Sequence, residues 1–79
     1  MSRRNNLDIC ADILQVARSG AKKTEIVYGA NLNFKVVEGY LRRLISEGLI
    51  QKFDRFFTTT PKGNQFVEQY RTMISPFMD

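Results

Sequence analysis

Apolar residues recur every three or four positions over residues 7–18, a spacing that places side chains on one face of a helix. Asn6 is a suitable N-cap for this helix, and Gly20 suits the left-handed position that ends one. A second, shorter helix is expected over residues 25–30, with Thr24 as its N-cap. The first part of the chain therefore predicts two consecutive helices.

A third helix is expected over residues 34–47, between an N-cap at Asn33 and a stop at Gly48. Projected as a helix, five of its apolar residues share one arc of about 100°. We assign this arc to the core: Phe34, Val37, Leu41, Leu44 and Ile45. The opposite arc contains no acidic residue, so the two faces of this helix are expected to have different partners.

The pattern changes after the third helix. Residues 49–53 and 56–60 are rich in β-branched and aromatic residues, and the two residues between them, Asp54 and Arg55, fit a tight hairpin turn. A short extended stretch or edge strand is expected at residues 21–23.

A last helix is expected from Pro61 to about residue 75, because Thr60 is a good N-cap and proline is tolerated at the first helical position. The predicted order is helix, strand, helix, helix, strand, strand, helix. A helix-turn-helix followed by a hairpin is a winged helix. The expected class is therefore mainly α with a small β-hairpin (α+β), in a single domain over residues 1–79.

The composition excludes several kinds of protein. The chain has 79 residues, no His and one Cys, Cys10, so neither a zinc site nor an internal disulfide is expected, and no cofactor is indicated. Without His, a suitably placed acid pair or a Gly-rich phosphate loop, an enzyme is disfavoured. No apolar run approaches the ~20 residues that span a membrane. We expect an intracellular, cytoplasmic protein.

The net charge is +4, and the excess lies in the first half of the chain. Residues 1–43 carry eight basic and four acidic groups, whereas residues 44–79 carry four of each. A localised basic excess attracts polyanions, so double-stranded DNA is the first partner to consider. A basic surface without a specific partner is the competing interpretation.

The outer arc of the third helix suits the DNA major groove. Arginine and lysine bond guanine edges or phosphates, and a small aliphatic side chain contacts a thymine methyl. The candidate contacts are Lys35, Val36, Gly39, Arg42, Arg43 and Ser46. A glycine such as Gly39 in a helix interior lowers the stability of the helix by about 1 kcal/mol relative to alanine. Close approach of a DNA backbone offsets that cost. Neutral drift or tight packing against the second helix is the alternative.

Other candidate DNA contacts flank this helix. They are Lys22 and Lys23 near the second helix, Tyr40, the wing residues Lys52 and Arg55, and a basic arm (residues 1–6) with Arg3 and Arg4. For the arm, plain disorder competes with a role in the groove. Asp54 between the two wing cations makes the wing a secondary contact.

The last helix and tail, residues 61–79, carry more apolar residues than a small winged helix covers. Their coiled-coil-like spacing indicates a second copy of the chain as the partner. The expected interface residues are Phe66, Tyr70, Met73, Ile74, Phe77 and Met78. A frayed tail is the alternative.

Six segments within about residues 7–72 carry a family resemblance: Asp12-Ile13-Leu14, Gly20-Ala21-Lys22-Lys23-Thr24-Glu25-Ile26, Ala30-Asn31-Leu32-Asn33-Phe34, Tyr40-Leu41, Gly48-Leu49-Ile50 and Thr60-Pro61-Lys62-Gly63. They resemble the archaeal winged-helix DNA-binding family that includes the small dimeric Sulfolobales chromatin proteins. The resemblance implies a DNA-binding winged helix that dimerises through its C-terminal helix. Relative to those proteins, Pro76 shortens the last helix, and the wing tip lacks glycine.

The leading hypothesis is a homodimeric, nucleoid-associated protein that regulates transcription or shapes DNA, with the third helix in the major groove. The alternative is a winged-helix module that binds another protein and has little affinity for DNA.

Overall fold

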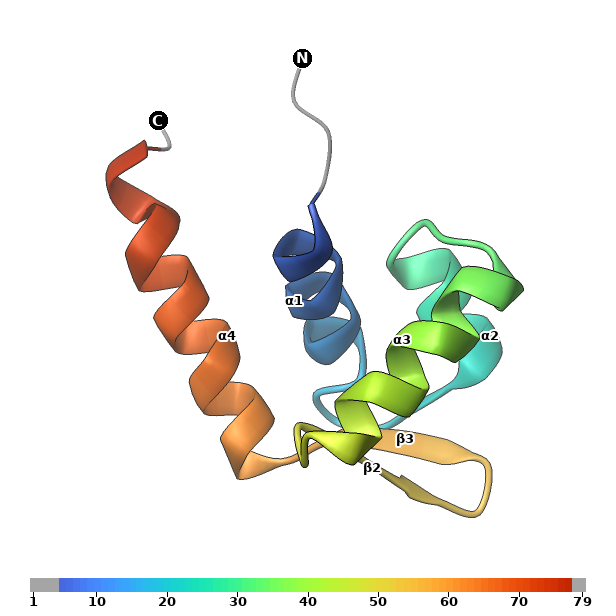
Figure 1. Cartoon of the computed structure of the whole chain (residues 1–79). Coiled ribbons are helices and arrows are strands. Elements are labelled where there is room, and N and C mark those ends of the chain that lie inside the picture. Colours follow the sequence, from blue (N-terminus) through green and yellow to red (C-terminus); the bar gives the residue numbers. More distant parts are fainter. Residues whose placement is uncertain (1–4, 78–79) are drawn as a thin grey trace.

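A computed structural model describes residues 5–77 of the chain. Within these residues, helices and strands follow the predicted order (Figure 1). They are α1 (Asn6–Val16), β1 (Ala21–Lys22), α2 (Lys23–Gly29), α3 (Phe34–Ser46), β2 (Ile50–Phe53), β3 (Phe56–Thr59), α4 (Pro61–Ile74) and a 3-10 turn (Ser75–Phe77). The predicted class is confirmed: the chain is mostly helical, with one small antiparallel sheet in the order β1-β3-β2.

Side-chain caps decide where α1 and α3 begin. Asn33 caps α3 as predicted, since its Oδ1 accepts the backbone N–H of Val36 at 2.8 Å. The predicted cap of α1 was wrong by one residue. Asn5, rather than Asn6, accepts the N–H of Asp8 at 2.8 Å, and the Asp8 carboxylate accepts the Asn5 N–H at 3.2 Å. This reciprocal capping box satisfies two N–H groups at once.

The start of α2 also differs from the prediction. Thr24 lies inside the helix, and the residue before the first turn is Lys22. The Glu25 carboxylate accepts the backbone N–H of Lys22 at 2.7 Å, which starts the helix earlier. Gly20 does adopt a left-handed conformation (φ +98°), but it lies in the turn that leads to β1 rather than directly at the end of α1.

The sheet places alternate side chains on opposite faces. Phe57 lies opposite Ala21 and Lys52, on the face that packs against the core, while Phe53 lies opposite Phe56 on the outer face. A two-residue turn joins β2 and β3, and its first residue, Asp54, has a φ of +60°. A positive φ at this position is typical of the turns that match the strand twist of a hairpin.

The core lies between the four helices and the inner face of the sheet, with Val67 as the contribution of α4. Its fully buried larger side chains are Ile13, Leu14, Ile26, Val37, Leu44 and Ile50. The predicted core face of α3 was partly wrong, because Phe34 and Ile45 are 46% and 40% exposed. The buried face of α3 is rotated toward Tyr40, which packs against the core.

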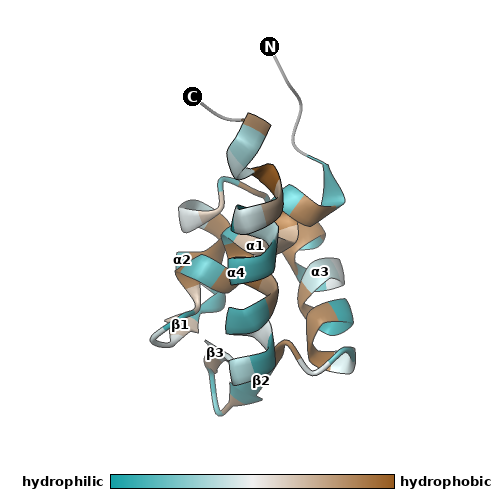
Figure 2. Cartoon of the chain, turned by 90° about the vertical axis from the view of Figure 1, so that its left-hand side faces the viewer, coloured by the Kyte–Doolittle hydropathy of each residue, from teal (hydrophilic) through white to brown (hydrophobic). Residues whose placement is uncertain are grey.

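Helix α4 begins at Pro61 as predicted, and the Thr60 hydroxyl accepts the N–H of Gly63 at 3.1 Å. It packs against α1 and β3, on the side of α1 away from α2 (Figure 1). Seen from the α4 side, hydrophobic residues appear in its last turns (Figure 2). Within residues 5–77, no helix combines the length and hydropathy needed to cross a membrane.

Candidate nucleic-acid interface

Helix α3 buries apolar residues on one side and exposes its basic residues on the other. Val37, Leu41 and Leu44 are buried on one side. All six residues predicted to face DNA are exposed on the helix surface: Lys35, Val36, Gly39, Arg42, Arg43 and Ser46. The hydrophobic face fixes the helix to the domain, so the cations are presented on a rigid element. Such a helix can enter a major groove and place guanidinium and ammonium groups at base edges or phosphates.

Gly39 lies in open space on this exposed face. An added Cβ at this position would have no neighbouring atom within 4 Å. Tight packing against α2 is therefore excluded, whereas close approach of DNA and neutral drift both fit an open position. The glycine leaves a smooth patch between Lys35 and Arg42–Arg43. A phosphodiester backbone can approach the helix closely there.

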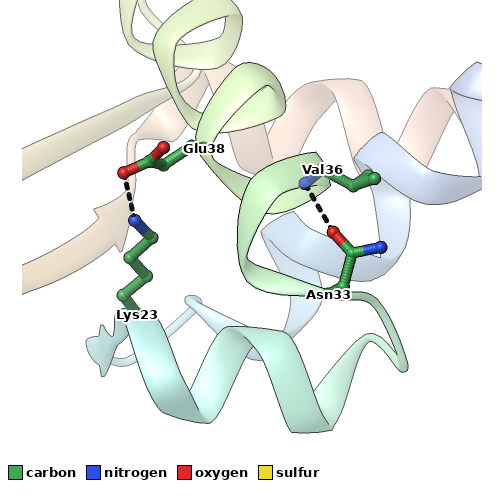
Figure 3. Close-up of polar contacts among 4 residues, drawn as sticks. All are labelled: Lys23, Asn33, Val36 and Glu38. Atoms are coloured by element: carbon green, nitrogen blue, oxygen red, sulfur yellow. Dashed lines mark hydrogen bonds and ion pairs between the residues drawn. The ribbon is translucent and has the colours of Figure 1, made fainter.

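An ion pair joins the two helices of the helix-turn-helix. The Lys23 ammonium donates to the Glu38 carboxylate at 2.6 Å (Figure 3). This hydrogen bond and the positive charge of Lys23 lower the pKa of Glu38. The pair was not predicted from the sequence. It engages one of the two lysines assigned to the start of α2 and places a carboxylate at the edge of the basic face.

Two other candidate residues on α3 have partners. The Tyr40 hydroxyl donates to Asn6 Oδ1 at 2.8 Å and so joins α3 to the start of α1. Arg43 Nε lies 3.5 Å from the Oε2 of Glu47, one turn further along the helix. The Arg43 side chain is still 77% exposed. An exposed pair of this kind contributes about 0.3–0.5 kcal/mol, which a phosphate readily replaces as partner.

A groove of about 810 Å³ runs beside this face, between α3, α1 and α4. Its apolar lining includes Leu7 and Cys10 of α1, Leu44 of α3 and Phe66 of α4, and Lys35 and Arg43 also line it. Burial raises the pKa of the Cys10 thiol, and the nearby Arg43 charge opposes this effect. Cys10 is therefore held as a thiol rather than activated as a thiolate.

The wing and the neighbouring strand β1 carry further cations. The Lys22 ammonium lies 5.9 Å from the centre of the Phe56 ring, and the Lys52 ammonium 5.7 Å from that of Phe57. Arg55 is exposed in the turn. Sequence reasoning missed that Phe53, next to this turn, is 83% exposed. Strict alternation along β2 from the buried Ile50 would have placed Phe53 on the outer face.

The predicted interface on α4 forms one surface. Phe66, Tyr70 and Ile74 are half-buried, whereas Met73 and Phe77 are 57% and 85% exposed. A second hollow, of about 160 Å³, is lined by Leu7, Phe66, Gln69, Tyr70 and Met73. Arg3, Arg4 and Met78 lie outside the described residues.

A family model for the winged helix-turn-helix matches residues 3–76, and the chain belongs to this family. The family and its fold are typically non-enzymatic. The fold is similar to the crystal structure of Sso10a-2, a DNA-binding protein from Sulfolobus solfataricus, with a TM-score of 0.84 and 26% sequence identity. The match covers 91% of this chain and 80% of that one. The resemblance to archaeal winged-helix DNA-binding proteins is confirmed.

Two relatives are uncharacterized proteins of the archaeon Methanocaldococcus jannaschii. One is 35% identical over 68 residues, which is 85% of this chain and 32% of the relative. The other is 33% identical over 64 residues, which is 80% of this chain and 66% of the relative. The chain therefore spans about a third of the first relative and about two thirds of the second.

Proposed function

We propose that the chain binds double-stranded DNA as a homodimer, with α3 in the major groove, and acts on cytoplasmic, nucleoid-associated DNA as a transcriptional regulator or an architectural protein. The observation that carries the proposal is the exposed outer face of α3, where three cations surround Gly39 and no acidic residue intervenes. The DNA-binding activity of Sso10a-2, which has the same fold, supports it.

The candidate residues take different roles in the proposed complex. Lys35, Arg42 and Arg43 contact bases and phosphates in the major groove, with Val36 and Ser46 between them. Lys22, Lys52 and Arg55 bind the backbone on the wing side, and Lys23 joins them when it is released from Glu38. Tyr40 positions α3 against α1 through Asn6.

The salt dependence of binding tests this function. Each phosphate contacted contributes a slope of about −0.9 to the logarithm of the affinity against the logarithm of salt concentration. With about five contacts we expect a slope of about −4 or steeper, and micromolar or tighter binding at low salt. Anisotropy of a labelled random duplex measures both quantities. Absence of binding at about 50 mM salt would contradict the proposal.

The dimer is proposed on the apolar surface of α4. Met73 and Phe77 are exposed at its end, and Leu7 and Phe66 line both hollows beside it, which makes the apolar surface continuous. Continuous apolar surfaces of this kind mark interaction sites, and a second copy of the same chain is the simplest partner.

Charge insertion tests the dimer. We expect the wild-type chain to sediment as a dimer and Met73→Lys to sediment as a monomer, because a lysine there would be buried without a partner. Thr72→Lys is the matched control, since it adds the same charge one residue away, where the side chain does not line the hollow. Monomeric wild-type protein that also fails to bind duplex would favour the protein-binding module.

A further inference from the structure

The outer face of the hairpin presents two phenylalanine rings to solvent. Phe53 and Phe56 lie opposite each other on β2 and β3, immediately before and after the turn. Their exposed fractions are 83% and 43%. Neither ring contributes to the hydrophobic core, whereas Phe57, the next residue along β3, does. An exposed aromatic pair on an ordered strand is an interaction surface rather than core that has been left uncovered.

The hairpin holds these rings on a fixed backbone. Every residue of β2 has a partner on β3, the turn has only two residues, and β1 pairs with the other edge of β3. The backbone of such an element loses little conformational freedom when it binds. The backbone that carries Phe53 is therefore already in place before binding.

Two cations, Lys22 and Arg55, lie next to the rings on β1 and in the turn. Lys22 lies opposite Phe56 on β1, with its ammonium 5.9 Å from the centre of that ring. Arg55 is exposed in the turn, where Asp54 is the neighbouring acid. The ammonium of Lys22 partly covers Phe56, so Phe53 is the more accessible ring. An apolar tip between cations matches the minor groove of a duplex, where phosphates flank an apolar stack of base pairs.

The position of the hairpin separates this surface from the proposed dimer surface. The turn and the C-terminal end of α4 lie at opposite ends of the molecule in both views (Figures 1 and 2). The hairpin follows directly from the C-terminal end of α3, with one short connection between Ser46 and Ile50. The rings therefore lie far from the proposed dimer surface at the C-terminal end of α4.

We propose that Phe53, supported by Phe56, inserts between base pairs in the minor groove and bends the duplex that α3 binds. This inference rests on the proposed DNA-binding function. Insertion of an apolar side chain partly unstacks a base step and kinks DNA toward the major groove. The flexible pyrimidine–purine steps are the expected sites, because they are the easiest to unstack. Lys22 and Arg55 bind the phosphates on either side.

Ligase-catalysed circularisation of a short DNA fragment measures the bend. A fragment of about 100 bp is shorter than the ~150 bp persistence length and closes poorly unless it is bent. With the fragment saturated, as judged by anisotropy, we expect the wild-type protein to raise the ligase-catalysed closure rate at least about tenfold. Phe53→Ala is expected to lose most of this increase, while Phe53→Leu, which keeps an apolar wedge, retains most of it.

Tyr28→Ala is the matched control. Tyr28 is 78% exposed and lies on α2, so its replacement removes a similar exposed ring away from the hairpin and should leave closure unchanged. Wild-type protein that binds duplex without raising closure would overturn the wedge and leave DNA binding intact. Equal closure with Phe53→Ala, or a change in oligomeric state of that variant, would also overturn it. Loss of duplex binding by the wild-type protein would overturn the proposed function itself.

Discussion

A Gly63→Ala protein is expected to unfold at a much lower urea concentration than the wild-type chain. Gly63 is buried in the first turn of α4, and an added Cβ would lie 2.1 Å from the backbone oxygen of Leu49 and 2.6 Å from the Thr59 side chain. Backbone atoms cannot move aside as a flexible side chain can, so the helix itself must shift.

That shift would break the connection between α4 and the sheet. The same Leu49 oxygen accepts the N–H of Thr60 at 3.0 Å, and Thr60 caps α4 through Gly63. We expect a loss of about 3 kcal/mol in the free energy of unfolding. A domain of this size has only about 3–5 kcal/mol to lose.

Urea unfolding followed by circular dichroism measures this effect. Gly39→Ala is the matched control, because its Cβ would meet no atom within 4 Å and it removes a glycine from a helix interior. That variant is expected to be more stable than wild type by up to about 1 kcal/mol. Equal midpoints for Gly63→Ala and wild type would show that α4 does not depend on this close approach.

The second large effect is expected on DNA binding. Replacing both Arg42 and Arg43 with alanine should lower duplex affinity at least about 30-fold, since each well-formed contact to a guanine contributes about 1–3 kcal/mol. If both arginines contact phosphates instead, the salt slope should fall by about 1.8, that is, 0.9 for each. Both residues are exposed, so the fold should be retained.

The double variant Arg18→Ala and Arg71→Ala is the control for net charge. It also removes two positive charges, and neither residue belongs to α3 or to the wing. Arg18 lies 3.9 Å from Glu68 of α4, away from the proposed DNA surface. We expect its affinity to stay within about threefold of wild type. Equal losses of duplex affinity in the two double variants would show that binding depends on overall charge, and would contradict a specific role for α3.

The order of helices and strands could be predicted because each boundary depends on nearby residues. Asn33 and Thr60 cap their helices through residues three positions away. The error at α1 arose because two neighbouring residues were equally suitable caps. Asn5 and Asn6 differ only in which of them has Asp8 three residues later, and Asp8 completes the capping box of Asn5.

The orientation of α3 was harder to predict than its length. A helical wheel built on apolar residues centred the buried face too near Phe34 and Ile45, because it left out Tyr40, which was assigned to the DNA-facing surface. Tyr40 instead packs its ring against the core and directs its hydroxyl to Asn6. The Lys23–Glu38 pair joins residues 15 positions apart, and only the angle between α2 and α3 brings them together.

The two-residue strand β1 has a consequence out of proportion to its length. It joins the start of α2 to β3, so the helix-turn-helix and the wing form a single body. In the proposed complex, folding fixes the distance between α3 and the hairpin tip. A duplex must place an adjacent major and minor groove at that distance, and its twist decides how much it must deform to do so. Over- or underwound DNA is then distinguished by the spacing of its grooves, in addition to the contacts with bases.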